Sequence, residues 1–216
     1  MPVPQGNWGH QEGNQLINEQ RAYDRQEQQA FVDRGLPTLN AQQSALYHAV
    51  MDSVTHAHKF IFFLHSGGGC DKIYLAKLIA AAVHARGDIA LCVSPTGLAF
   101  LLLPGGCTAH SHFKIPIPCH EQSTCNIKMD DLNHQLFQQI SLIIWDEAGS
   151  QHHHVVESVD RTLYDLLNRN QPFGGITILF GGDFRQILPV IQHGSREQIV
   201  PATLTYSNLW ANMTVH

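Results

Sequence analysis

The sequence has 216 residues, enough for one or two domains with a sizeable core. Hydrophobic residues make up 44% of it and charged residues 14%, which excludes an intrinsically disordered protein. The formal net charge is −5, a poor match to a protein that grips duplex DNA mainly through its phosphates.

The sequence also gives no sign of a membrane segment or a disulfide framework. No apolar run approaches the ~18 residues that a membrane helix needs, and the first residues do not resemble a secretory signal. The five cysteines form no C-x-x-C pair. We therefore expect an intracellular protein with no membrane partner.

The first 36 residues are polar and rich in Gln, so we expect residues 1–36 to form a flexible lead-in with one short helix over 27–32. Pro37 marks a boundary, and residues 37–216 are expected to fold as one domain. Asn40 is a suitable N-cap for a following helix, because apolar residues then recur at helical spacing.

From there, apolar runs alternate with helical patterns. Strands are predicted at residues 60–64, 89–93, 142–145 and 176–180, and helices at residues 73–85 and 155–167. Continuously apolar strands that alternate with helices are typical of a mostly parallel sheet covered on both faces, in which ligands bind at the strand ends. The predicted fold class is α/β.

A glycine-rich turn follows the first strand, in the stretch Ser66 to Ile73. A phosphate-binding loop reads G-x-x-x-x-G-K-[ST] between a strand and a helix, where backbone amides and a lysine surround phosphate. Gly67, Gly68, Gly69 and Lys72 suit that role, but the two defining glycines and the hydroxyl residue are missing. A glycine-rich turn in an ordinary α/β protein explains this stretch about as well.

Two adjacent carboxylates, Asp146 and Glu147, end the strand at 142–145. In nucleotide hydrolases the first such acid holds Mg²⁺ and the second polarises the attacking water. The alternative is that two acids merely end a buried strand. A third polar cluster, Gly181 to Val190, follows the strand at 176–180; it suits a group that senses a terminal phosphate, or a turn followed by an edge strand.

Four segments together resemble one family, the petite-integration-frequency (PIF) type of DNA helicase, which includes the helicases of Helitron rolling-circle transposons. They occur in the family's order, and the resemblance covers the chain from about Leu39 onward. The segments are Leu39–Gln43, Leu102–Pro116, Leu142–Ala148 and Leu179–Val190.

The resemblance implies a RecA-like P-loop NTPase fold and a superfamily-one helicase, which couples ATP hydrolysis to 5′-to-3′ movement on single-stranded DNA. It also implies a role in DNA repair and recombination, and a nuclear location with a mitochondrial one as the alternative. By the same resemblance, Gln43 recognises adenine, Lys72 contacts the β and γ phosphates, Asp146 holds Mg²⁺, Glu147 activates water and Gln186 reads the γ phosphate.

The resemblance further implies a path for single-stranded DNA. Its residues are Thr96, Gly97, Thr108, His110, Ser111, Phe113 and Lys114. Phe113 offers a face on which a base can stack and Lys114 a phosphate contact. The alternative for Phe113 is a core aromatic.

Three residues depart from the family's pattern at the phosphate loop: Ser66 and Asp71 stand where the family has Gly, and Ile73 where it has Thr or Ser. Ile73 cannot bind Mg²⁺, and a carboxylate at Asp71 repels phosphate by about 4 kcal/mol at ~4 Å and an effective dielectric of ~20. We therefore expect weakened nucleotide binding. The family's motor also needs a second domain of the same type, which we expect to be absent from this sequence.

Three hypotheses follow: an impaired helicase motor domain, a non-catalytic transposon-derived fragment that binds single-stranded DNA, and a metal-binding module. The third is suggested by 15 histidines, with His152, His153 and His154 consecutive. Consecutive residues on a helix point in different directions and zinc ligands usually come in spaced pairs, so no zinc is expected and a solvated helix start is preferred.

Overall fold

The fold is a six-stranded sheet in which all the pairings are parallel. The structure is a computed structural model, and it describes residues 13–58, 60–65, 71–97, 102–129, 131–186, 188–191 and 194–216. The strand order is β3-β2-β4-β5-β1-β6. The strands are β1 (Ile61–His65), β2 (Ile89–Ser94), β3 (Cys107–Thr108), β4 (Ile140–Trp145), β5 (Thr177–Gly182) and β6 (Met213–Val215).

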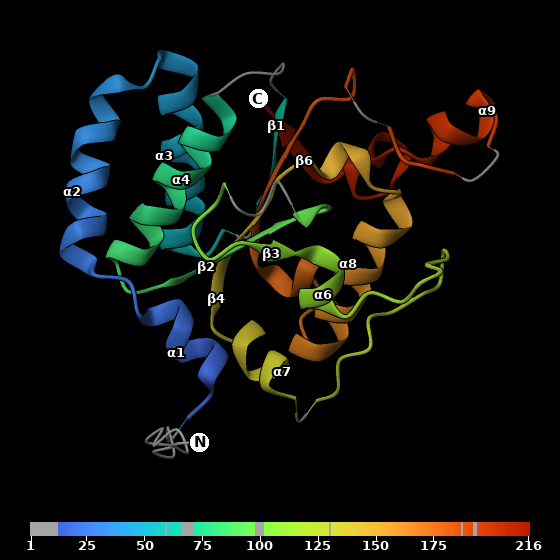
Figure 1. Cartoon of the computed structure of the whole chain (residues 1–216), viewed down its shortest axis with the longest axis horizontal. Coiled ribbons are helices and arrows are strands. Elements are labelled where there is room, and N and C mark those ends of the chain that lie inside the picture. The colour runs from blue at the N-terminus through green and yellow to red at the C-terminus, as the bar shows by residue number, and fades with distance from the viewer. Residues whose placement is uncertain are drawn as a thin grey trace, which may run out of the picture.

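Helices cover both faces of this sheet (Figure 1). One face carries α2 (Arg25–Gly35), α3 (Ala41–His56) and α4 (Asp71–Ala85), and the other carries α6 (Ala109–Phe113), α7 (Leu132–Phe137) and α8 (His153–Leu167). The remaining helices are α1 (Gln15–Arg21), α9 (Arg196–Ile199) and the short 3-10 turns Leu36–Thr38, Ala148–Ser150, Pro172–Gly175, Val200–Ala202, Leu204–Tyr206 and Trp210–Asn212. None of the helices described is both long and apolar enough to cross a membrane.

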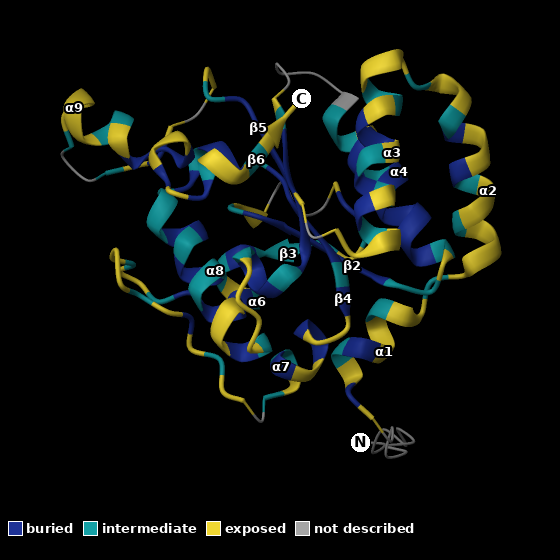
Figure 2. Ribbon diagram, turned by 180° about the vertical axis from the view of Figure 1, so that it is seen from behind, coloured by how far each residue is buried: buried dark blue, intermediate teal, exposed yellow. Residues whose placement is uncertain are grey.

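Alternate residues of β1, β2, β4 and β5 enter two separate cores. In β4, Leu142 and Ile144 pack with the α2–α4 layer, whereas Ile143 and Trp145 pack with the α6–α8 layer. Because successive side chains of a strand point to opposite faces, a strand that is covered on both sides must be apolar throughout. Figure 2 shows the central strands buried along most of their length and the outer faces of the helices exposed.

The strands and helices predicted after residue 36 are confirmed, with ends shifted by at most two residues. The short helix expected over residues 27–32 is present as the longer α2, and α1 was not predicted; both helices pack on the domain. Asn14 and Asp24 cap these helices through their side chains, and Ile17 and Val32 are buried. Two buried side chains among many polar ones gave too weak a periodicity to predict either helix in full.

Candidate functional site

The carboxyl ends of β1, β4 and β5 lie side by side. In the sheet register His65 of β1 is opposite Gly182 of β5, and Trp145 of β4 is opposite Phe180 of β5. The segments that follow β4 and β5 therefore meet at one edge of the sheet, where β1 also ends. They begin the second and third motifs of the sequence, and Lys72 of the first motif lies at the start of α4.

Asp146 directly follows β4, where its backbone N–H donates to the carbonyl of Val93 at 2.9 Å. The residue is only 7% exposed, and burial raises the pKa of its carboxyl above the ordinary value, while the Glu147 backbone N–H and the charge of Lys72 act in the opposite direction. A Cβ at Gly181 would lie 3.0 Å from Oδ1 of Asp146, so a larger residue at position 181 would push this carboxylate away. Lys72 is close enough for its charge to act on the Asp146 carboxyl.

Glu147 has a left-handed backbone, with φ of 55° and ψ of 26°. That region is unfavourable for a residue with a Cβ, and such strain collects at functional sites. The Glu147 carbonyl accepts hydrogen bonds from the backbone N–H and the Oγ of Ser150, at 3.0 and 2.8 Å, which stabilises the conformation. This turn follows Asp146 directly, so both acids lie at the same end of β4.

A cavity of about 370 Å³ opens at the same edge. Its lining combines the start of α3, the end of β1 and the start of α4, and includes Gln43, His65 and Lys72. Gln43 also closes the N-terminus of α3, since its Oε1 accepts from the backbone N–H of Asn40 at 3.0 Å and its own N–H donates to Oδ1 of Asn40 at 2.9 Å. The second lone pair of Oε1 and the amide N–H₂ group of Gln43 remain for a ligand.

The third motif forms a compact turn around Asp183. Arg185 donates to Oδ1 of Asp183 through its backbone N–H and its Nε, both at 3.0 Å, and these bonds lower the pKa of the Asp183 carboxyl. Nε2 of His65 lies 3.5 Å from the same oxygen. Gln186 follows in the turn with an exposed side chain, and its backbone N–H donates to the Asp183 carbonyl at 3.1 Å. The alternative of an edge strand is wrong for residues 183–186 and 188–191, which contain no strand.

His65 was missed in the sequence, although it joins two of these motifs. It ends β1, lines the cavity and stacks near Phe184, with ring centroids 6.2 Å apart and planes inclined by 16°. Its place as the last residue before the glycine-rich turn was the signal that could have identified it. It connects the phosphate-loop side of the site with the Asp183 turn.

The phosphate-loop predictions fall partly outside the described residues. Gly67, Gly68 and Gly69 lie there, as does Ser66. Lys72 is the second residue of α4 and lines the cavity. Ile73 is half-buried and packs against the core on the α2–α4 side. An apolar side chain thus stands where the family has a hydroxyl.

The candidate DNA residues separate into surface and core. Thr96, Gly97 and Ser111 are exposed, and Thr108 and His110 are half-buried, with Thr108 capping α6. Phe113 corrects the sequence interpretation, because it is 1% exposed and its ring stacks on Phe137 and Trp145 at 5.6 and 5.5 Å. It is a core residue whose face is not open to a base.

The side chain of Lys114 is also engaged in a contact within the protein. It ends α6 in a left-handed conformation, with φ of 51°, and its ammonium forms an ion pair with Asp131 that lowers the pKa of that carboxyl. A phosphate would have to compete with this carboxylate for Lys114. Two of the seven candidate DNA residues are therefore engaged elsewhere.

A family model described as PIF1-like helicase matches residues 38–216. The chain belongs to the PIF1-like helicase family. The ATP-dependent DNA helicase PIF1 of Homo sapiens is 27% identical over 191 residues, which are 81% of this chain and 28% of the human protein. PIF4 of Trypanosoma brucei brucei is 28% identical over 132 residues, 58% of this chain and 16% of that protein. The chain thus spans less than a third of the length of these curated relatives.

Solved structures of Pif1 helicases have the same fold. A structure of two coordinating Pif1 helicases at forked double-stranded DNA aligns with a TM-score of 0.64 and 19% identity, over 82% of this chain and 44% of that one. Pif1 from Candida albicans aligns with a TM-score of 0.62 and 21% identity, over 82% and 39%. The expected RecA-like P-loop NTPase fold is confirmed.

Proposed function

We propose that this chain is the first motor domain of an ATP-dependent DNA helicase, in which the edge formed by β1, β4 and β5 binds the nucleotide. The observation that supports the proposal is that Lys72 and Gln43 line one cavity, while the charge of Lys72 acts on Asp146, which with Glu147 follows β4 at the same sheet edge. The names of the relatives support it, since the proteins from Homo sapiens and Trypanosoma brucei brucei are called ATP-dependent DNA helicases. Bacteroides Pif1 has been solved with ADP-AlF4.

In this proposal each residue has a role that its position permits. Gln43 recognises adenine, using the amide group and lone pair that the helix cap leaves free. Lys72 neutralises the β and γ phosphates, and Asp146 holds the Mg²⁺ that accompanies the nucleotide. Glu147, at the strained turn that follows Asp146, orients and polarises the attacking water. Gln186 senses the γ phosphate once its exposed side chain turns inward.

Single-stranded DNA is the proposed second substrate. Bacteroides Pif1 was solved with single-stranded DNA, and the exposed candidates here are Thr96, Gly97 and Ser111, with Thr108 and His110 beside them. We exclude Phe113 from this surface. Movement in the 5′-to-3′ direction, work in DNA repair and recombination, and descent from a Helitron-type helicase complete the proposal.

The altered phosphate loop supports a second candidate, a non-catalytic domain that binds single-stranded DNA. Ile73 has no hydroxyl to offer Mg²⁺, and its side chain packs against the core. A carboxylate at Asp71, the first residue of α4, would repel phosphate. The two candidates differ in one property, which is whether the rest of the nucleotide site is intact.

Restoring the loop separates them. We would titrate a fluorescent ATP analogue into the natural chain and into the double variant Asp71→Gly/Ile73→Thr, with and without Mg²⁺. Removing the repulsion should strengthen binding by up to ~10³-fold, and the restored hydroxyl at position 73 should make binding stronger with Mg²⁺ than without it. Lys72→Ala in the restored chain is the matched control, and it should lose the gain.

Failure of the restored chain to bind nucleotide up to millimolar concentration would refute the helicase proposal for this domain. The non-catalytic candidate would then stand, provided that the same protein still bound a labelled oligothymidylate. Circular dichroism of each variant establishes that it is folded.

A further inference from the structure

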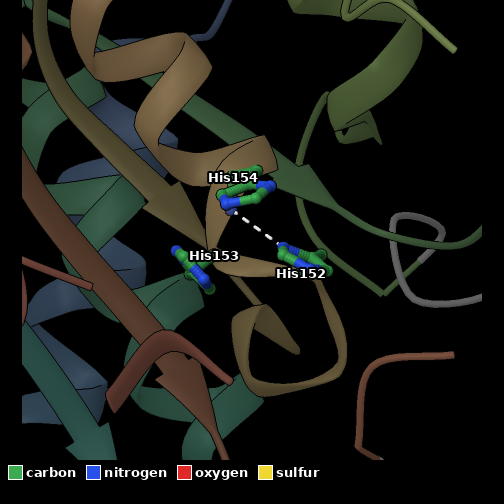
Figure 3. Close-up of side chains that lie close together, drawn as sticks. All are labelled: His152, His153 and His154. Atoms are coloured by element: carbon green, nitrogen blue, oxygen red, sulfur yellow. Dashed lines mark hydrogen bonds between the residues drawn. The ribbon is translucent and has the colours of Figure 1, made fainter. Parts of the chain in front are cut away.

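Three consecutive histidines bring their ring nitrogens together at the start of α8. The potential ligand atoms of His152, His153 and His154 all lie within 4.8 Å of one another, and Figure 3 shows the three rings gathered around one space. Their ring centroids are 4.3 to 4.8 Å apart. Only His153 and His154 are helical, so the three rings do not point in the different directions expected for three consecutive helical residues.

The reason is that α8 begins at His153. His152 is the N-cap residue and has an extended backbone, with φ of −62° and ψ of 134°. Its side chain folds back over the first turn, where Nδ1 accepts a hydrogen bond from the backbone N–H of His154 at 3.1 Å. An extended residue followed by two helical ones can direct three neighbouring side chains to one point, which three helical residues cannot do.

The surroundings of the three rings favour an ion over solvent. All three histidines are half-buried, and His153 has a side chain that is 17% exposed. Oε1 of Glu157, one helical turn further on and itself 14% exposed, lies 3.1 Å from Nδ1 of His153. The contact is not aligned as a hydrogen bond, so this nitrogen has no bonding partner among the described residues. The same Oε1 of Glu157 accepts a hydrogen bond from the Oγ of Ser207 at 2.6 Å, which holds the carboxylate beside His153.

We propose that His152, His153 and His154 form a binding site for a divalent transition-metal ion of the Zn²⁺ type, with Glu157 positioning His153. Three imidazoles suit Zn²⁺ rather than Mg²⁺ or Ca²⁺, which prefer oxygen ligands. A tetrahedral Zn²⁺ with Zn–N distances of ~2.0–2.1 Å holds its nitrogens ~3.4 Å apart, so the rings need to approach by about 1.4 Å at most. The proposal therefore requires rotation of the three side chains when the ion binds.

Glu157 lies where a carboxylate can hold a metal-binding histidine without touching the metal itself. When it accepts a hydrogen bond from Nδ1 of His153, the Nε2 lone pair of that ring faces outward for the metal, an arrangement that is common in zinc sites. His152 offers the Nδ1 lone pair that the His154 N–H now occupies, so binding there exchanges one hydrogen bond for a metal bond. Water completes the coordination.

A second cluster in the chain provides an internal control. Asp52, His56 and His58 also have potential ligand atoms within 4.8 Å, but all three residues are exposed. The Asp52 carboxylate lies 2.9 Å from Nδ1 of His56 and 3.3 Å from Nδ1 of His58, and thus already pairs with both rings. We expect this cluster to bind zinc much more weakly than the first.

The test is a zinc titration of the full chain without an affinity tag, in competition with a chromophoric chelator. We expect one Zn²⁺ per chain, and a loss of affinity of at least ~10-fold in His152→Gln/His154→Gln. The matched variant His56→Gln/His58→Gln should bind as the natural chain does. Glu157→Gln should weaken binding by ~10-fold or more while the stoichiometry stays at one.

Substituted cobalt gives a readout that does not depend on any variant. Co²⁺ bound to the natural chain should show the strong visible absorption of a tetrahedral site, and Zn²⁺ should displace it. Stoichiometry well below one, or equal losses in the two double variants, would overturn the proposal. Cys119, whose Sγ donates to the His154 carbonyl at 3.5 Å, is the nearby alternative ligand. A loss in Cys119→Ser equal to that of the histidine variant would overturn the all-histidine ligand set.

Discussion

Replacing Phe113 by Ala tests whether the segment after β3 belongs to the core or binds DNA. The ring is 1% exposed and stacks on two others, Phe137 and Trp145, with planes inclined by 19° and 20°. Truncating a buried Phe to Ala typically costs 3–5 kcal/mol, from the lost transfer free energy and the cavity that remains. Because two ring contacts are lost as well, we expect about 4 kcal/mol.

Urea unfolding measures this cost. With a slope of about 2 kcal/mol per molar, a loss of 4 kcal/mol moves the midpoint down by about 2 M. Trp145 is fully buried with its ring centroid 5.5 Å from that of Phe113, so its fluorescence reports on this part of the core. Tyr206→Ala is the control, since Tyr206 is 59% exposed and its removal should change the free energy of unfolding by no more than about 0.5 kcal/mol.

A milder variant, Phe113→Leu, keeps the chain folded for DNA-binding measurements. If Phe113 stacked on a base, this change would weaken the affinity for single-stranded DNA by part of the ~1–3 kcal/mol that such a contact contributes. We expect no change in DNA affinity. A loss of less than about 1 kcal/mol of stability in Phe113→Ala, together with weakened DNA binding in Phe113→Leu, would refute the core assignment.

Three further predictions concern a buried histidine, an ion pair and a strained turn. Burial lowers the pKa of His112 to about 4. In the unfolded chain the pKa of this histidine is near 6.5, so as the pH falls the unfolded state takes up the proton first and is stabilised. Between pH 7 and 4.5 the natural chain should therefore lose about 2.5 kcal/mol more free energy of unfolding than His112→Phe. Equal losses in urea titrations at the two pH values would contradict this. Asp131→Asn releases Lys114 and should strengthen single-stranded DNA binding about 2–5-fold at low salt in an anisotropy assay. The control is Asp88→Asn, which removes the same charge from the pair with Arg86 and should not change DNA binding. Equal effects of the two substitutions would mean that the change in net charge, and not the release of Lys114, strengthens binding. Glu147→Gly relieves the left-handed backbone and should raise the free energy of unfolding by about 0.5–1 kcal/mol, so a fall in the urea midpoint would argue against strain at this residue.

The sequence predicted the centre of the fold well for a physical reason. A strand covered on both faces must be apolar along its length, so β1, β2, β4 and β5 stand out as continuous runs. The strands β3 and β6 have two and three residues, too few for any pattern to emerge. They pair only because β2 and β1 already offer their backbones at the sheet margins.

The site residues that directly follow a strand could be predicted from the sequence. Asp146 and Glu147 follow β4 directly, and parallel strands bring such residues to one edge. Phe113 was ambiguous because an aromatic residue in a short segment carries no periodicity that separates core from surface. The convergence of His152, His153 and His154 depends on where α8 begins, and helix boundaries are the least certain part of a sequence pattern.

The coupling between nucleotide and DNA tests the motor proposal most directly. We would measure the affinity of the restored chain, Asp71→Gly/Ile73→Thr, for a labelled oligothymidylate with and without saturating Mg²⁺ and a non-hydrolysable ATP analogue. A motor domain must link its two ligands, and typical coupling free energies of ~1–3 kcal/mol correspond to a change of at least ~5-fold in DNA affinity. We expect such a change, and expect Lys72→Ala to abolish it. Identical DNA affinities with the nucleotide demonstrably bound would contradict the proposal that this domain is part of a helicase motor.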